Sequence, residues 1–200
     1  MTREDRIGGL KVVGAMAALM WVVEVVDAID SHRLDRWGIQ PREGDGLIGV
    51  VTAPFLHVGF GHLMGNTIPF LIMGAAIALG GALRVLAVTA IVALISGLGT
   101  WIIAPAGTVH LGASGVVFGY AAYLIFRGLF DRSLLSLGVG AIVAAAFGAV
   151  LLGGLVPHTG VSWQAHFFGA VGGLVAARVL SARAGQEQLG EGPARGRLAV

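Results

Sequence analysis

The stretch HLGASGVVFGYAAYLIF, residues 110–126, decides the fold expected for this chain. It carries no Lys, Arg, Asp or Glu, yet a lone hydroxyl, Ser114, stands between Gly112 and Gly115 near its start. A helix from Ser114 to Phe126 would be only about 20 Å long at 1.5 Å per residue, whereas the hydrocarbon core of a bilayer is about 30 Å thick. The stretch therefore predicts a short membrane helix that begins at Ser114, at the bottom of a depression open to water.

The composition around this stretch is that of a membrane protein. Of the 200 residues, 56% are hydrophobic and 12% are charged, against about 25% charged in a soluble domain. Between Gly46 and Phe130 the only charged residues are Arg84 and Arg127. The absence of cysteine excludes disulfides and thiol catalysis, and we expect no nucleic-acid partner because no basic patch is evident.

Six membrane-spanning helices are expected, forming an all-α bundle with a short central fourth helix. The predicted spans are residues 8–26, 61–80, 83–103, 113–125, 134–155 and 162–180. A polar segment, 27–46, separates the first two spans. Residues 1–180 are predicted to form a single domain, and the Gly-, Ala-, Gln- and Arg-rich tail, 181–200, is predicted to be disordered.

The basic residues predict the orientation in the membrane. If both termini are cytoplasmic, the inner side holds Arg3, Arg6, Lys11, Arg84, Arg127, Arg132, Arg178, Arg183, Arg195 and Arg197, and the outer side holds Arg33, Arg36 and Arg42. This excess satisfies the positive-inside rule. The loops 27–56, 105–112 and 156–160 would then face outward. We expect a multi-pass protein of a bacterial plasma membrane, because the abundance of Ala, Gly and Arg suits a GC-rich genome.

A catalytic role for Ser114 requires a base within hydrogen-bond reach. His166, in the stretch WQAHFFGAVGG (163–173), lies near the outer end of the last span. The fourth span carries Gly115 and Gly119, and the sixth carries Gly169 and Gly173, both at the GxxxG spacing that permits close helix contact. Packing of these two faces would bring Ser114 near His166.

No carboxylate is expected beside this pair. Eight of the eleven Asp and Glu residues lie at or before Asp45, and the others are Asp131 on the cytoplasmic side and Glu187 and Glu191 in the tail. A Ser–His pair on the outer side must therefore work as a dyad. Its imidazole would be oriented by packing or by a neutral partner instead of an acid.

The stretch FLHVGFGHLMGNTIPF, residues 55–70, supplies hydrogen-bond donors. His62 and Asn66 are four residues apart and share one helix face near the outer end of the second span. Together with the N–H of Ser114 at a helix start, they can donate to a developing oxyanion. His57 lies further out and receives less weight than His62.

These three stretches together resemble the rhomboid intramembrane serine proteases. The family pattern has His-x-x-x-x-His-x-x-x-Asn on the second helix, Gly-x-Ser-Gly opening the fourth, and Ala-His followed by glycines on the sixth. The matching residues are His57, His62, Asn66, Gly112, Ser114, Gly115, Ala165, His166, Gly169 and Gly173. The resemblance covers residues 8–180 and rests on the order, the spacing and the host helices of the motifs.

The resemblance implies a serine endopeptidase that cleaves transmembrane proteins. Ser114 would be the nucleophile and His166 the general base, with the Ser114 N–H, His62 and Asn66 around the oxyanion. Substrates would enter from the lipid near the second and fifth helices. Supporting roles are implied for Gly112, Gly115, Phe118, His57 and Gly169.

Two positions depart from the family pattern. Phe118 stands where relatives often carry a tyrosine that stacks on the catalytic histidine, so a ring is kept without its hydroxyl. The Trp-Arg motif of the first outer loop is absent, because Trp37 and Arg42 are not adjacent.

Other functions and structural roles stay open at this point. A non-catalytic rhomboid-like protein that binds membrane clients is the alternative, although such relatives usually lack the serine or the histidine. A small transporter or metal channel is a third reading, but no carboxylate accompanies the histidines deep in the membrane. Each polar residue also has a purely structural interpretation. Ser114 could bond to a carbonyl of its own helix, and Asn66 could join two helices by a hydrogen bond. His32, His110 and His158 could be solvated, and Glu24 and Asp27 could lie at the membrane interface or bond to a neighbouring helix. No cofactor or metal is expected, and the sequence leaves the substrate and the oligomeric state open.

Overall fold

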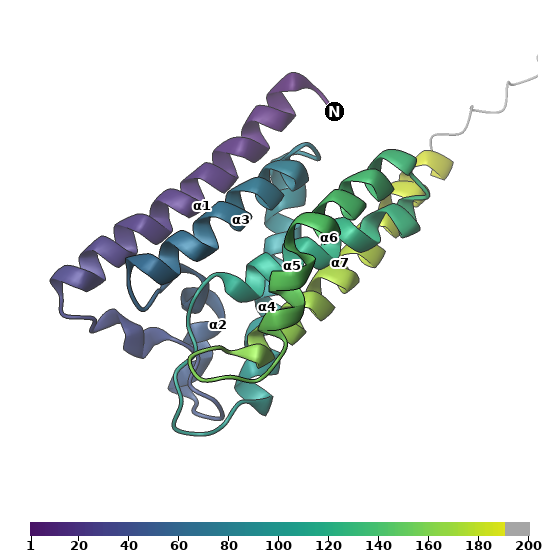
Figure 1. The fold of residues 1–200 in the computed structure, drawn as a ribbon. Coiled ribbons are helices and arrows are strands. Elements are labelled where there is room, and N and C mark those ends of the chain that lie inside the picture. The colour runs from purple at the N-terminus through teal and green to yellow at the C-terminus, as the bar shows by residue number, and fades with distance from the viewer. Residues whose placement is uncertain (191–200) are drawn as a thin grey trace, which may run out of the picture.

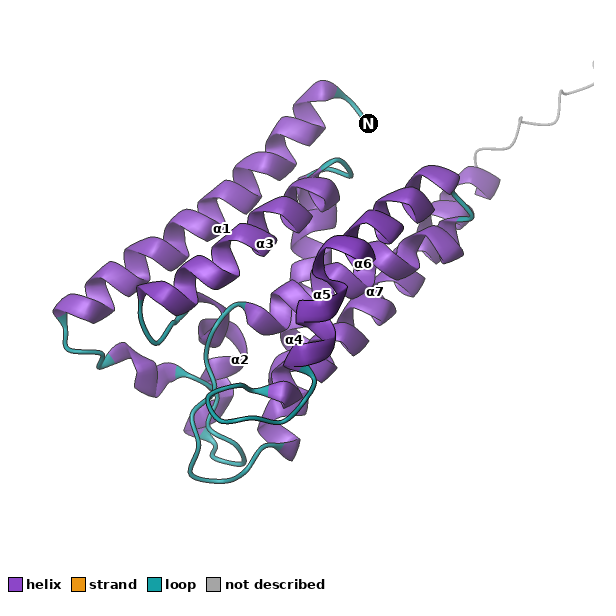
Figure 2. Ribbon diagram, viewed as in Figure 1, coloured by secondary structure: helices purple, strands orange, loops and turns teal. Residues whose placement is uncertain are grey.

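The computed structural model describes residues 1–190, and it describes side-chain surroundings as far as residue 181. Within that range the chain is a helical bundle without a strand (Figures 1 and 2). The elements are α1 (Arg3–Ile29), η1 (Leu34–Trp37), η2 (Asp45–Ile48), α2 (Gly49–Thr52), η3 (Ala53–Phe55), α3 (Phe60–Ala78), α4 (Ala82–Ile103), α5 (Ser114–Asp131), α6 (Leu134–Gly154) and α7 (Trp163–Gly190). The predicted all-α bundle is confirmed.

Four of these helices, α1, α3, α4 and α6, are long and apolar enough to cross a membrane. Each begins and ends within a few residues of its predicted span, except that α1 starts earlier, at Arg3. There Thr2 forms a capping box with Asp5, which satisfies free N–H groups at the helix start.

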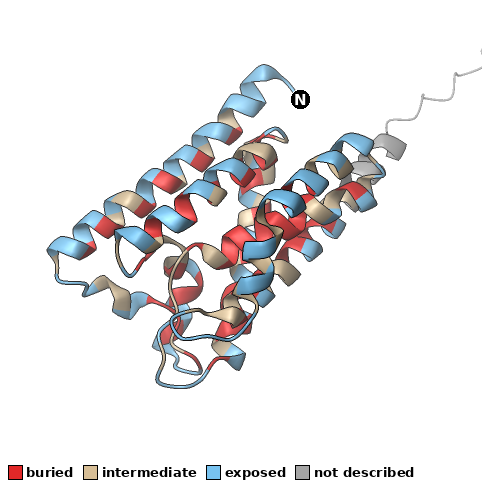
Figure 3. Ribbon diagram, viewed as in Figure 1, coloured by how far each residue is buried: buried red, intermediate tan, exposed pale blue. Residues whose placement is uncertain are grey.

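The central helix is α5, as Figure 3 indicates by its concentration of buried residues. It begins at Ser114, but the prediction that it ends near residue 125 is wrong, because it continues to Asp131. The Arg127 Nε donates to Asp131 Oδ2 at 2.7 Å, and this i,i+4 ion pair supports the additional turn. At 18 residues, α5 is still the shortest of the six long helices.

Glycines allow α5 and α7 to lie against each other. A Cβ at Gly169 would collide with the carbonyl oxygen of Gly115, and one at Gly173 would collide with that of Gly119. The predicted contact between these two glycine faces is therefore confirmed. On the neighbouring helix α4, Ser96 Oγ donates to the Ala165 carbonyl of α7 at 2.8 Å.

The outer segment between α1 and α3 is more ordered than its polar sequence suggests, with η1, η2, α2 and η3 following one another. Ile39 and His110 exchange two backbone hydrogen bonds of 2.8 and 2.9 Å. Trp101 Nε1 donates to the Glu43 carbonyl at 2.9 Å. The segment is thereby fixed both to the loop that leads into α5 and to the last turns of α4.

The last helix extends beyond its predicted end. The α7 helix continues past Leu180 to Gly190, into the range that the sequence predicts as a disordered tail. Residues 191–200 lie outside the described residues, and the prediction for them stays a prediction.

Candidate active site

Ser114 is the first residue of α5 and is placed there by a glycine turn. Gly112 has φ +114°, which a residue with a side chain rarely adopts. A Cβ at Gly112 would also lie only 2.6 Å from His62 Cε1. The Gly112 N–H donates to the Ala53 carbonyl at 2.9 Å, so the loop is tied to η3 just before the helix begins.

A cavity of about 540 Å³ brings the predicted site residues together. It is lined from α3, α5, α6 and α7, and among its residues are Ser114, His166, His62, Asn66 and Phe118. Within the described part of the chain, no hydrogen bond joins Ser114 to His166. The two side chains face one cavity, and catalytic hydrogen bonds are often formed only when substrate is bound.

His166 is 7% exposed and is held on two sides. Its ring stacks on Phe118 with the centroids 4.0 Å apart and the planes 4° from parallel. Its Nδ1 lies 2.7 Å from the carbonyl oxygen of Gly154. A carbonyl can only accept, so Nδ1 carries the proton and Nε2 is left able to accept one. A neutral partner thus takes the place that a carboxylate has in a triad.

The Gly154 carbonyl is a contact that sequence reasoning missed. Gly154 is the last residue of α6, where carbonyl groups have no partner within the helix. A Cβ there would lie 2.6 Å from Phe118 Cζ and 3.0 Å from His166 Nδ1. Only the fold shows that this glycine, twelve residues before His166, borders both rings.

If Ser114 and His166 form the dyad that the sequence predicts, Gly154→Ala should lower the cleavage rate by roughly 10- to 100-fold, because displaced catalytic groups lose rate steeply. The new methyl group would push apart the Phe118 and His166 rings. Gly153→Ala is the matched control, since nothing lies within 4 Å of its Cβ position. Rates measured on a transmembrane model substrate should differ between the two variants, and equal rates would contradict the role assigned to Gly154.

His62 and Asn66 each have a buried side-chain nitrogen beside Gly112 without a hydrogen-bond partner among the described residues. Asn66 is 6% exposed, and within residues 1–181 neither its Nδ2 nor the buried His62 Nδ1 has a hydrogen-bond partner. The Cβ position of Gly112 is 2.9 Å from His62 Nε2 and 3.5 Å from Asn66 Nδ2, so both groups lie against the turn that leads to Ser114. Buried polar groups without partners are costly and often mark functional sites.

His57 supports the turn from behind. It is 1% exposed, its Nε2 accepts from the Ala113 N–H at 3.3 Å, and its ring meets that of His62 edge-on at 5.2 Å. Burial, followed by the charge of His62, lowers the pKa of His57 to about 4. The neutral ring is the form that accepts the Ala113 N–H.

This lowered pKa predicts a loss of stability in mild acid. An unfolded chain protonates His57 near the ordinary histidine pKa of 6.5, whereas the folded chain resists protonation until about pH 4. Stability is therefore fully present above pH 6.5 and decreases as the pH falls toward 4, by about 1–2 kcal/mol between pH 7 and 5. His57→Gln keeps an acceptor and should flatten this part of the profile of unfolding midpoint against pH. An unchanged slope would contradict the assignment.

His110 is not the solvated loop residue that the sequence predicts. It is half-buried, its Nδ1 lies 2.8 Å from Ser162 Oγ, and its Nε2 lies 2.8 Å from Thr108 Oγ1. Burial lowers the pKa of His110. By contrast, His158 is exposed, as expected, and contacts the Val156 carbonyl at 2.8 Å.

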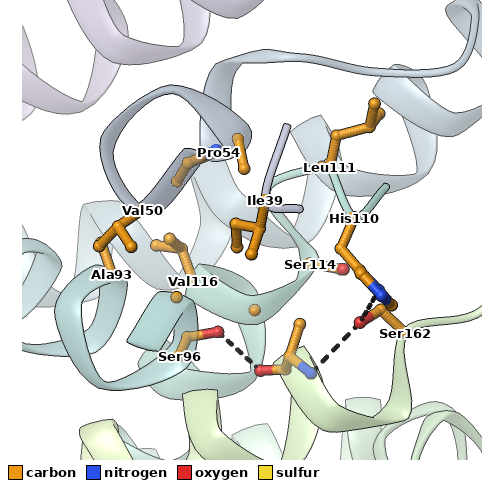
Figure 4. Close-up of a pocket in the computed structure, with 15 residues that line it drawn as sticks. Ile39, Val50, Pro54, Ala93, Ser96, His110, Leu111, Ser114, Val116 and Ser162 are labelled. Carbon is orange, nitrogen blue, oxygen red and sulfur yellow. Dashed lines mark hydrogen bonds between the residues drawn. The ribbon is translucent and has the colours of Figure 1, made fainter. Parts of the chain in front are cut away.

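A second, smaller cavity lies behind Ser114 (Figure 4). Ser96, His110, Ser114 and Ser162 line it, and its volume of about 20 Å³ is enough for one water molecule. Ser114 therefore borders both cavities. Figure 4 shows His110 and Ser162 side by side next to it.

Comparison with known proteins agrees with this architecture. The model of the Rhomboid domain family matches residues 45–183. The uncharacterized protein Rv1337 of Mycobacterium tuberculosis is 44% identical over 184 residues, covering 88% of this chain and 76% of that protein. The uncharacterized protein ML1171 of Mycobacterium leprae is 43% identical over 185 residues, covering 88% and 72%.

A more distant relative carries a functional name. The "Putative rhomboid protease YdcA" of Bacillus subtilis is 29% identical over 127 residues, covering 63% of each chain. Because the family match spans more than half of the sequence, the chain belongs to the rhomboid family and is a multi-pass integral membrane protein.

Proposed function

We propose that this protein is a serine-type intramembrane endopeptidase with a Ser114–His166 dyad. Membership of the rhomboid family supports a protease of the hydrolase kind. The observation that carries the serine mechanism is the His166 ring, whose proton-bearing Nδ1 is held by Gly154. Its Nε2 is thereby left as an acceptor on the cavity that Ser114 also lines.

The chemistry is an acyl transfer in two steps. Ser114 Oγ attacks the scissile carbonyl carbon while its proton passes to His166 Nε2. The oxyanion accepts hydrogen bonds from Asn66 Nδ2, His62 and the Ser114 N–H. His166 then gives the proton to the leaving amine, and an ester to Ser114 remains. A water molecule, deprotonated by His166, attacks this ester, and the acid product and the free Ser114 hydroxyl are released.

The substrates we propose are membrane-spanning segments of other proteins. The larger cavity extends between α3 and α6, where Pro69, Met73, Phe147 and Val150 line it. The α6 helix buries only Gly140 and Val143 of its residues, so most of its surface is left to contact lipid or an entering substrate. We further propose that the enzyme acts in a bacterial plasma membrane with both termini cytoplasmic, which matches the distribution of its basic residues.

Labelling with a fluorophosphonate probe tests this proposal. The purified protein should be labelled at Ser114, and His166→Ala should abolish the labelling because the nucleophile loses its base. His158→Ala is the control, since this histidine lines the same cavity but is exposed. Labelling that persists in His166→Ala would refute the dyad. A folded protein without labelling would favour the client-binding alternative.

A further inference from the structure

A second group of titratable side chains lies away from the candidate active site, at the outer end of α1. Asp27 belongs to the last turn of this helix, His32 follows it, and Asp35 lies in η1. One ligand atom from each of these three residues lies within 4.8 Å of the others. Two atoms bound to one Zn²⁺ ion at about 2.1 Å are at most about 4.2 Å apart, so small shifts of these side chains would bring all three onto one ion.

Glu24 extends this cluster inward. It lies one turn before Asp27 on the same helix face, and both residues are 0% exposed. Both carboxylate oxygens of Glu24 have no hydrogen-bond partner among the described residues, and neither has Oδ1 of Asp35. Glu24 lies within Coulombic range of Asp27, His32 and Asp35, and the backbone of Gly59 is its other polar neighbour, so its carboxylate adds negative charge beside the cluster.

No basic side chain in the described chain neutralises these carboxylates. Arg33 pairs with the half-exposed Asp30 at 3.6 Å, and Arg36 lies over the Trp37 ring. Only the half-exposed His32 contacts the cluster, at 3.2 Å from Asp27 Oδ2. Buried carboxylates require a counter-charge or a proton, so the cluster lacks a positive partner.

We propose that Asp27, His32 and Asp35 form a binding site for a divalent transition-metal ion, with the buried carboxylate of Glu24 as a negatively charged neighbour. Two carboxylates and one imidazole favour Mn²⁺ or Zn²⁺, because Ca²⁺ and Mg²⁺ prefer sites built from oxygen alone. The half-exposed His32 gives the ion a route from the outer solvent. Asp27 Oδ1 already accepts from the Leu34 N–H at 2.7 Å, which leaves Oδ2 as its ligand atom.

Such an ion would fasten the outer segment to α1. It would join η1 to the end of this helix, and η1 leads directly to Ile39, which pairs with His110. His110 lies two residues before Gly112. Metal binding would thus stabilise the segment that borders Ser114. Any effect of this on catalysis by Ser114 rests on the proposed function, whereas binding of the ion does not.

The test is metal binding by the full-length protein in detergent, freed of affinity tags and treated with a chelator. Mn²⁺ binding is followed by electron paramagnetic resonance, and Zn²⁺ binding by the loss of bound Mn²⁺ when Zn²⁺ is added. The unfolding temperature reports on folding. We expect one Mn²⁺ per chain, displaced by Zn²⁺, and a raised unfolding temperature. Asp35→Asn should weaken binding at least about tenfold, and Glu24→Gln should weaken it by a smaller factor because it removes only a neighbouring charge, whereas Asp30→Asn, in a half-exposed carboxylate paired with Arg33, should not weaken it.

Three results would overturn the site. One is the absence of saturable Mn²⁺ or Zn²⁺ binding to folded protein. Another is binding that survives both Glu24→Gln and Asp35→Asn. The third is binding of Ca²⁺ in preference to both ions, which would exclude the transition-metal assignment. None of these measurements uses proteolysis, so the proposed protease function and the metal site fail or succeed separately.

Discussion

Ser114→Ala is expected to reduce cleavage of a transmembrane model substrate by at least about a thousandfold, and His166→Ala by a similar factor. Without the hydroxyl no acyl-enzyme can form, and without the imidazole no group accepts its proton. The double variant should be little slower than either single one, because the two side chains act as a unit.

The matched control is Ser136→Ala, which removes a hydroxyl near the start of α6, far along the chain from Ser114. It should cleave at nearly the rate of the unaltered protein. Ser114→Ala and Ser136→Ala should keep the same unfolding temperature, because neither serine donates a side-chain hydrogen bond within the described chain. Full activity in folded Ser114→Ala would refute the serine mechanism.

Gly173→Ala is expected to destabilise the bundle by about 2–4 kcal/mol. Its Cβ would collide with the backbone carbonyl of Gly119, which cannot move without separating α5 from α7. Activity should fall as well, since these helices carry Ser114 and His166. Unfolding by SDS in mixed micelles measures the change.

Gly148→Ala, on α6, is the control for this change in stability. Nothing lies within 4 Å of its Cβ position, and alanine favours a helix over glycine by up to about 1 kcal/mol. The control should therefore be neutral or slightly stabilised. If the two variants unfold at the same SDS fraction, close contact between the glycine faces of α5 and α7 is not important for stability.

Much of this fold could be predicted from the sequence because its signals are local. Long apolar runs locate α1, α3, α4 and α6, and the GxxxG spacings predict the α5–α7 contact. The end of α5 was missed because Arg127 suggests a membrane boundary, whereas its ion pair with Asp131 carries the helix onward.

In the candidate site, residues in local motifs could be predicted, whereas contacts made only by the tertiary fold could not. Motif spacing selected Ser114 and His166, which the fold places on one cavity. The partner of His166 could not be predicted, since a backbone carbonyl leaves no mark in the sequence and Gly154 resembles any helix-ending glycine. The burial of His57 and Glu24 likewise depends on which elements cover them, a tertiary property.

The Gly154–His166 bond joins the proposed catalytic base to α6, which buries only Gly140 and Val143 of its residues. Any outward swing of α6 that makes room for a substrate also withdraws this carbonyl and leaves the imidazole unanchored. The ring regains its orientation only when α6 returns. Substrate entry and peptide-bond cleavage would then require different positions of α6. With α6 displaced, the enzyme would hydrolyse other peptide bonds near its cavity only slowly.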